Sequence, residues 1–155
     1  MEVLDAKKEG ELLILNINSS EAKISFFKEV EENEDVTLQL SPTLFINLDE
    51  RSFAIKIKAV FYNSSEDTAI SSPIAVVISF AAKDFESIFS LTKESIQIMQ
   101  MQVVLKMLDT TIGTIRGVLY EQTKGTTLSD FSLPIITMQN FIKELKIKVI
   151  RKKEN

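Results

Sequence analysis

The chain has 155 residues, of which 45% are hydrophobic and 26% charged, and its formal net charge is −4. This length suits one domain with a real core, the composition is not that of a disordered chain, and the mild acidity argues against nucleic acid as the main partner. Cysteine and histidine are both absent, which excludes disulfides, the commonest general base, thiol nucleophiles and most zinc and copper sites.

The two ends of the chain are polar, and we expect residues 1–11 and 151–155 to be flexible around a single domain that spans 1–155. The start lacks the basic segment and the small-residue cleavage site of a secretory signal. No apolar run approaches the length of a transmembrane helix. We therefore expect a cytoplasmic globular protein.

The first two predicted strands are separated by an acidic stretch. Leu12–Phe27 indicates one long or broken strand, and residues 28–35, KEVEENED, form a connection. That connection is either a plain solvated loop or a group of carboxylates that could hold a hard cation, and we prefer the loop. A second strand begins at Val36, with Leu38 and Leu40 on the same face. Ser41-Pro42 interrupts it, because proline cannot donate to a ladder, and residues 44–48 continue extended.

Two further strands follow. In SFAIKIKAVFY, residues 52–62, apolar residues alternate with Lys56 and Lys58, which predicts a strand with one wet face. Asn63–Asp67 is a turn by composition. The fourth strand, Ile74–Phe80, carries Ala and Val on its second face.

A long helix is predicted over Thr92–Gly125, with Gly125 as its left-handed C-terminal cap. Steps of three and four place one apolar stripe on its face: Ile98, Met101, Leu105, Leu108, Ile112, Ile115 and Leu119. A second apolar set falls largely outside that stripe, and we assign it to an oligomer interface, together with two glycines four residues apart: Val103, Val104, Met107, Gly113, Gly117 and Val118. The glycines either permit close approach of another backbone or are simply tolerated, at roughly 1 kcal/mol each against alanine.

The C-terminal region contains an apolar loop, a short helix and a basic tail. Phe131 and Leu133 in the loop must rest on something, and the helix presents Met138, Phe141, Ile142 and Leu145 on one face. The tail KIKVIRKKEN is either a solubilising terminus, which we prefer, or a segment that meets an acidic surface.

These elements predict an α+β domain with a four-stranded antiparallel sheet, a long helix and a second shorter helix. One helix pair covers only one face of such a sheet, so we expect a homo-oligomer. No glycine-rich phosphate loop or paired catalytic residues are present, so we predict no enzymatic activity, no cofactor and no metal.

Several stretches in this order resemble the SecB family of export chaperones, over nearly the whole chain. KISFF (23–27) is similar to the ISF run of the family's first strand, and VTLQL (36–40) to its second strand. The helix ending at Lys124-Gly125-Thr126 and the passage SLPIITMQNFI (132–142) are similar to the family's helix closure and its entry to the last helix.

The resemblance implies an ATP-independent holdase, a dimer of dimers, that captures unfolded or pre-export polypeptides in hydrophobic grooves. The matching client-binding positions here come from the first connection, the second strand and the last helix with its preceding loop: Phe26, Phe27, Val36, Leu38, Leu40, Phe131, Leu133, Met138, Phe141, Ile142 and Leu145. Exposed apolar surface of this kind marks a binding site, whereas any single member of the group could instead belong to the core.

One departure from the family concerns the export motor SecA. Family acids that flank the ISF run and lie in the fourth strand dock SecA, but here Lys23 and Phe27 flank it and Ile74–Phe80 has no acid. We therefore do not predict docking to SecA. The alternatives to a general holdase are an adaptor with the same fold dedicated to one partner, such as an antitoxin, and a small-molecule binding domain.

Overall fold

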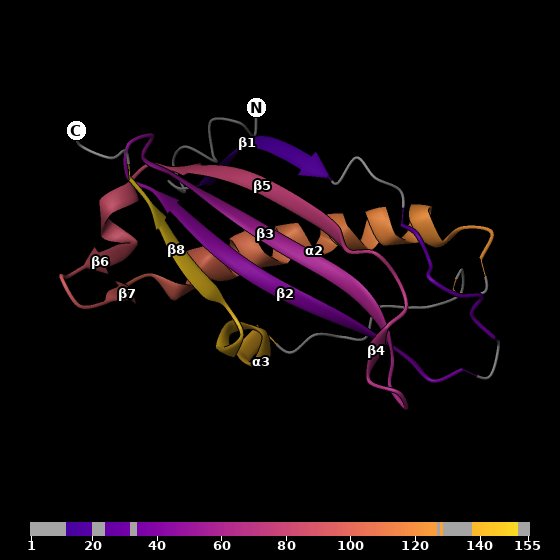
Figure 1. The fold of residues 1–155 in the computed structure, drawn as a ribbon. Helices are drawn as coiled ribbons and strands as arrows, with labels where there is room; N and C mark the ends of the chain where they lie inside the picture. The colour runs from indigo at the N-terminus through magenta and orange to yellow at the C-terminus, as the bar shows by residue number, and fades with distance from the viewer. Residues whose placement is uncertain (1–11, 20–23, 32–33, 127, 129–137, 152–155) are drawn as a thin grey trace.

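The computed structural model describes residues 12–19, 24–31, 34–126, 128 and 138–151, and for Ser19 and residues 138–140 it describes the backbone only. The chain forms one six-stranded sheet, a two-stranded hairpin, a long helix and a short helix (Figure 1). The elements in chain order are β1 (Leu12–Ser19), β2 (Val36–Asn47), β3 (Ser52–Asn63), β4 (Thr68–Ala69), β5 (Ile74–Ala82), the 3-10 helix η1 (Phe85–Ser87), β6 (Phe89–Leu91), β7 (Ile96–Ile98), α2 (Met101–Thr123), α3 (Met138–Lys143) and β8 (Lys146–Ile150).

The main sheet has the strand order β1-β5-β3-β2-β8, with β4 paired to β3. Every pair is antiparallel except β2 with β8, which is parallel. The α+β class is as predicted, but the sheet is larger than four strands and mixed. The added parallel strand is made by Lys146–Ile150, the start of the predicted basic tail. Its period-two pattern places Ile147 and Val149 beside the core and the lysines outside.

Two hairpin turns close in the same way. The side-chain oxygens of Asn47 and Asn63 accept hydrogen bonds from the backbone N–H groups of Glu50 (3.0 Å) and Glu66 (2.9 Å). Arg51 and Asp67 then take positive φ values near the end of each turn. An asparagine that bonds its own turn in this way fixes the register of the strands that follow.

Strand β2 runs through Ser41-Pro42 with an unbroken register against β3, so the predicted interruption is wrong. Proline lacks only the N–H, and an edge position tolerates that loss. Of the two forms predicted for Leu12–Phe27, one long strand or a broken one, the structure has the broken one. Strand β1 ends at Ser19, and Phe26 makes only an isolated bridge to Ser71.

The long helix α2 lies across one face of the sheet and contacts β3 and β5 (Figure 1). Helix α2 starts at Met101, not at Thr92, because residues 89–98 form the β6–β7 hairpin. Gly125 has a φ of 81°, which confirms the predicted left-handed position after the helix. None of the helices in the described ranges is long and apolar enough to span a membrane.

The core lies between α2 and the inner faces of β2, β3 and β5. Its largest fully buried side chains include Phe53, Phe61, Phe80 and Met107. Buried Thr111 donates its hydroxyl to the backbone carbonyl of Met107, four residues earlier, at 2.8 Å. The Thr111 hydroxyl can be buried in this core without being left unsatisfied, because the helix itself supplies its hydrogen-bond partner.

Candidate functional site

The first half of β2 presents a half-buried apolar row on the side of the sheet that α2 covers. Val36, Leu38 and Leu40 are partly buried and pack against the core, whereas Thr37 and Gln39 on the other face are exposed. In the second half of the strand, the same face becomes fully buried. The apolar side chains of residues 36–40 are therefore only partly covered, in contrast to those of the second half of the strand.

The outer edge of the same half of β2 is unpaired among the residues that the structure describes. Strand β8 pairs with β2 only over Thr43–Asn47, and the described residues provide no strand beside residues 36–42. An unpaired row of backbone N–H and C=O groups can accept a further extended segment by strand addition. An apolar row beside an open edge offers both parts of such a site, since the edge supplies hydrogen bonds and the row supplies side-chain contacts.

The C-terminal helix lies beside this region, at the foot of β8 (Figure 1). Phe141 is buried at 4% exposure, while Ile142 and Leu145 are half-buried against the core. Leu145 lies after the helix, whose last turn closes with a 3.0 Å hydrogen bond from the Leu145 N–H to the Ile142 carbonyl. Phe141 is therefore a core residue in the single chain, and Ile142 and Leu145 extend the half-buried surface.

For three predicted client-binding positions, the structure does not describe the side chain. Phe131 and Leu133 lie outside the described residues, and of Met138 only the backbone in α3 is described. Their assignment to the groove stays a prediction.

The segment 24–31 forms a second part of the site, at the far end of α2. The Phe27 N–H donates to the Ile70 carbonyl at 2.8 Å, and the Ser72 N–H donates to the Ser25 carbonyl at 2.8 Å. These bonds hold Phe26 against Phe61, with ring centroids 5.9 Å apart, and leave Phe27 66% exposed. One phenylalanine of the predicted pair thus anchors the segment, and the other is free to contact a partner.

A pocket of about 270 Å³ lies between this segment and the chain that follows α2. Its lining comes from both segments: Phe26, Lys28, Glu29, Val30, Gly125, Thr126 and Leu128. The pocket has an apolar floor, because Val30 and Leu128 are buried, and a charged rim. It is slightly smaller than the roughly 300–1,000 Å³ of typical small-molecule sites.

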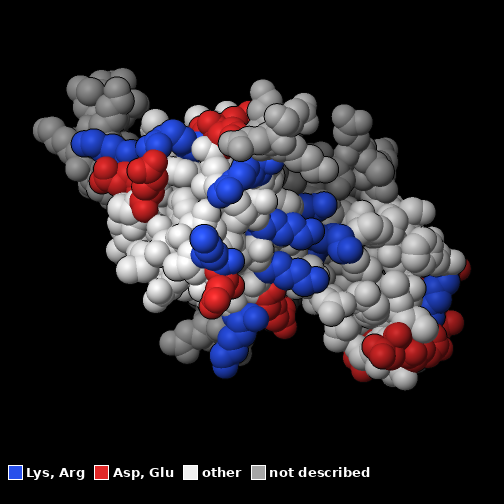
Figure 2. All heavy atoms as spheres, turned by 60° about the vertical axis from the view of Figure 1, so that its left-hand side comes forward, with Lys and Arg blue, Asp and Glu red and all other residues white. Residues whose placement is uncertain are grey.

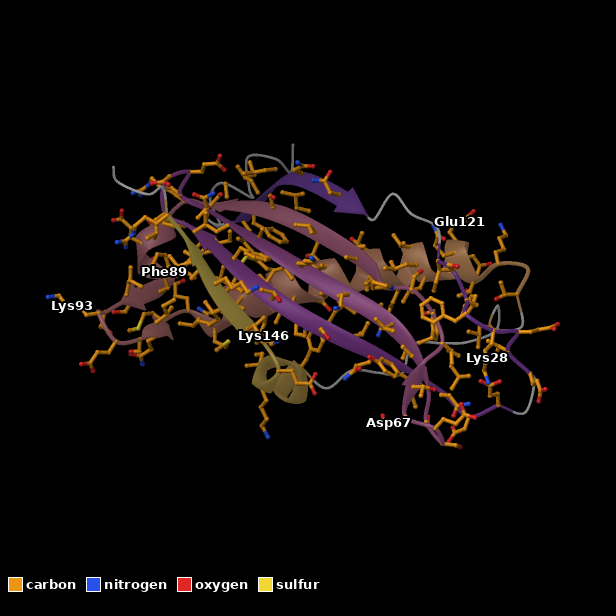
Figure 3. The ribbon with its side chains drawn as sticks, viewed as in Figure 1. Lys28, Asp67, Phe89, Lys93, Glu121 and Lys146 are labelled. Carbon is orange, nitrogen blue, oxygen red and sulfur yellow. The ribbon has the colours of Figure 1, made fainter. Side chains whose placement is uncertain are left out.

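The charged rim is held by one ion pair. The Lys28 ammonium lies 3.0 Å from a carboxylate oxygen of Glu34, which also accepts a 3.1 Å hydrogen bond from the Asn63 side-chain amide. The hydrogen bond from Lys28, with a smaller one from Asn63, lowers the pKa of Glu34 below its ordinary range. The same bond raises the pKa of Lys28. Figure 3 shows Lys28 at this end of the molecule, near the turn that carries Asp67.

Replacing Lys28 by methionine should therefore raise the pKa of Glu34. Because the pKa is depressed in the folded state, the stability contributed by this carboxylate is present above its unfolded pKa and is lost as the pH falls through the folded value. A carboxyl titration followed by nuclear magnetic resonance measures the change, with the exposed Lys93→Met as the control. An unchanged Glu34 pKa in Lys28→Met would contradict the assignment.

The residues predicted for an oligomer interface separate into two groups. Val103, Val104 and Met107 are buried within the single chain, at 7%, 0% and 0% exposure, so their side chains already pack in the core. Gly113 and Gly117 are exposed, and Val118 is half-buried. Nothing in the described chain lies within 4 Å of a Cβ placed on either glycine. No described residue therefore requires glycine there, and an interface over these positions stays a prediction.

Strand β1 carries an exposed apolar surface that the sequence reasoning missed. Four of its side chains are 46–58% exposed: Leu13, Ile14, Leu15 and Ile17. Among the described strands, β1 pairs only with β5. The run Leu12–Leu15 has no polar face at all, which was the available signal for an edge that needs covering.

Acidic side chains do not form a metal site in the described ranges. No three Asp or Glu residues there come together in a way that could hold a metal ion. The acidic residues described between Glu29 and Asp35 contribute one ion pair instead, through Glu34.

No protein-family model matches the chain, and no curated protein matches it. Among solved structures, the chain is similar to the SecB-like chaperone Rv1957 of Mycobacterium tuberculosis, which was solved in complex with a ChAD peptide from the antitoxin HigA1. The TM-score is 0.53 at 13% identity, and the alignment covers 85% of this chain and 95% of that one. The chain therefore shares the SecB-like fold.

Proposed function

We propose that this protein is an ATP-independent chaperone that binds extended apolar segments of other polypeptides. One observation carries the proposal: the half-buried row Val36, Leu38 and Leu40 lies beside an edge of β2 that no described strand pairs. A sheet edge with an apolar row can bind many sequences, because backbone hydrogen bonds do not depend on side chains. The SecB-like neighbour was solved with a bound peptide, which supports a polypeptide partner.

The test is aggregation of chemically unfolded proteins diluted into buffer, followed by light scattering. We expect near-stoichiometric suppression for several unrelated proteins, with no effect of added ATP. A folded protein without chaperone activity, at the same concentration, is the control. The absence of suppression for every unfolded protein would overturn general holding.

A dedicated adaptor is the second candidate, and the antitoxin peptide of the neighbour favours it. Such a protein would bind one partner tightly and leave unrelated unfolded proteins to aggregate. The pocket beside Phe26 lies just below the usual size range for small-molecule sites, so it gives less support to a ligand-binding domain.

We propose a cytoplasmic, non-enzymatic protein that needs no cofactor or metal, and we do not extend the proposal to delivery to SecA. The acids that dock SecA in the family have no counterpart in the described β5, Ile74–Ala82.

We also propose that the protein is a homo-oligomer in which β1 of one copy meets a second copy. An eight-residue edge strand with apolar side chains on both faces is an aggregation hazard unless another chain covers it. A two-fold axis beside β1 would pair the same strand from both copies and bury these side chains.

Leu15→Lys should dissociate this oligomer. A lysine in the middle of β1 would be buried between the two copies without an acidic side chain to neutralise its charge. Leu15 is 58% exposed in the single chain, so the variant should fold. Light scattering coupled to size-exclusion chromatography measures the mass. Leu91→Lys, the same change at an exposed leucine of β6, should leave the mass unchanged. A monomeric parent protein, or equal effects of both changes, would contradict the β1 interface.

A further inference from the structure

The face of the sheet opposite α2 carries four lysines on two strands. Lys56 and Lys58 point outward from β3, because their neighbours Ile55 and Ile57 are buried. Lys146 and Lys148 point the same way from β8, and both are exposed. Figure 3 shows Lys146 at the start of β8, whose ribbon lies beside β2.

The registers of the strands place these lysines in one diagonal band. Thr43 of β2 pairs with Lys56 of β3 on one side and with Lys146 of β8 on the other. Two residues away in opposite directions along β2, Ser41 pairs with Lys58 and Phe45 pairs with Lys148. Neighbouring strands are about 4.8 Å apart and alternate residues about 6.7 Å apart. Adjacent lysines of the band are therefore roughly 7–10 Å apart at their backbones, a distance at which like charges repel at low salt.

No acidic residue balances this band within the sheet. The strands β1, β5, β3, β2 and β8 contain no Asp or Glu on either face. The ion pairs in the described part of the chain are Lys28 with Glu34 and Arg51 with Glu86, so none of the four lysines has an acidic partner there. Figure 2 shows a group of Lys and Arg side chains near the middle of one face, with acidic side chains around it rather than within it.

The band is also interleaved with apolar side chains. Phe45 and Val77 are half-buried on this face, and Ile150, which pairs with Asn47, is 45% exposed. Lysine stems lie along apolar surface while their ammonium groups reach water. The face therefore combines positive charge with a few accessible apolar side chains.

We propose that this sheet face docks an acidic segment of another polypeptide, with carboxylates that meet the lysine band and apolar side chains that meet Phe45 and Ile150. The chain as a whole is acidic, at −4. Its described acidic residues lie outside the strands of the sheet, as at Glu66-Asp67, at Asp49-Glu50 in the turn after β2, and at Glu29, Glu31, Glu34 and Asp35. A long polyanion or an anionic membrane would extend over these acidic regions and be repelled, whereas a short acidic segment fits within the band.

The proposal does not rest on the chaperone activity, because the two surfaces lie on opposite sides of the sheet. Val36, Leu38 and Leu40 share the face that α2 covers, whereas Lys56 and Lys58 lie on the other. A client in the apolar row and an acidic partner on the lysine band can therefore bind at the same time.

The test is fluorescence anisotropy of a short labelled peptide of alternating glutamate and serine, with the glutamine–serine peptide as the matched probe. The full chain should bind the glutamate peptide, and salt should weaken binding. Lys56→Glu with Lys148→Glu should lower the affinity by about tenfold or more, because two attractions become repulsions. The same reversal at exposed Lys93 and Lys106, away from the sheet face, should have little effect.

Several results would overturn the proposal. The first is that the glutamine peptide binds as tightly as the glutamate peptide. The second is that the control variant at Lys93 and Lys106 loses as much affinity as the variant at Lys56 and Lys148. The third is that oligo-thymidine or phosphatidylserine-containing vesicles bind more tightly than the glutamate peptide and lose this binding in the Lys56 and Lys148 variant. Salt-dependent self-association lost in the same variant would assign the face to a second copy instead. Lys56→Gln with Lys148→Gln should show an intermediate loss and serves if charge reversal disturbs folding. Suppression of aggregation should be unchanged in these variants. A failure of the acidic-segment proposal can therefore be distinguished from a failure of the chaperone proposal.

Discussion

Phe53→Ala should lower the free energy of unfolding by about 3–5 kcal/mol, the range for a fully buried phenylalanine replaced by alanine. Phe53 is 1% exposed and lies at the start of β3. Its ring centroid is 4.7 Å from that of Phe85 and 6.1 Å from that of Phe89, which it meets edge-on. The three rings join the β6–β7 hairpin to the end of the sheet, so the change removes packing on both sides.

Thermal denaturation measures this loss as a fall in Tm of roughly 6–20 °C for a domain of this size. Phe27→Ala is the matched control, because Phe27 is 66% exposed. It should change the free energy of unfolding by less than about 0.5 kcal/mol. If both variants lost the same stability, the aromatic cluster would not hold the hairpin to the sheet.

Leu38→Asp should abolish suppression of aggregation, whereas Gln39→Asp should leave it nearly unchanged. The two residues are neighbours on β2, and both changes add one negative charge, but Leu38 faces the apolar row and Gln39 faces water. A client that buries its apolar side chains on the row would also have to bury the new carboxylate without a partner. We expect the affinity for an unfolded client to fall by about tenfold or more.

Both variants should be compared at a temperature where circular dichroism shows that each is folded, because Leu38 is partly buried. Leu38→Asn is a neutral second variant that separates the charge from the lost apolar contact. If Gln39→Asp removed as much activity as Leu38→Asp, clients would bind the lysine-bearing face and the proposed groove would be wrong.

The strands with one wet face were the most predictable part of the fold. In β3, lysines alternate with large apolar residues, so Phe53, Ile55 and Ile57 could be assigned to the core from spacing alone. The side of β2 that carries Leu38 and Leu40 followed in the same way. Period two identifies the face of a strand, because successive side chains point to opposite sides.

The start of the helix was less predictable, because Ile96, Ile98 and Met101 fit both periods. Ile96 and Ile98 are two apart, as in a strand, while Ile98 and Met101 are three apart, as in a helix. The predicted extension of the helix over residues 92–100 shifted its apparent apolar stripe. Val103, Val104 and Met107 were then assigned outside the stripe, whereas the structure buries them against the sheet.

The open edge of the candidate site could not be predicted without β8. The segment KIKVI alternates as a strand does, yet five residues near the C-terminus give no indication of a partner as distant as Thr43–Asn47. Where β8 begins decides which part of β2 is left unpaired. The apolar row was therefore visible in the sequence, but its position beside a free edge was not.

The parallel pairing of β8 with β2 has a consequence for how the chain folds during synthesis. Strands β2, β3 and β5 leave the ribosome before Lys146–Ile150 and can pair in sequence. Closing this pair joins Thr43 to Lys146 across most of the chain, which costs more loop-closure entropy than either hairpin turn. Until then the whole outer edge of β2 is open, including the stretch that carries Leu44 and Ile46. A nascent copy of this protein therefore displays the same feature, an apolar strand with a free edge, that the finished copy is proposed to bind.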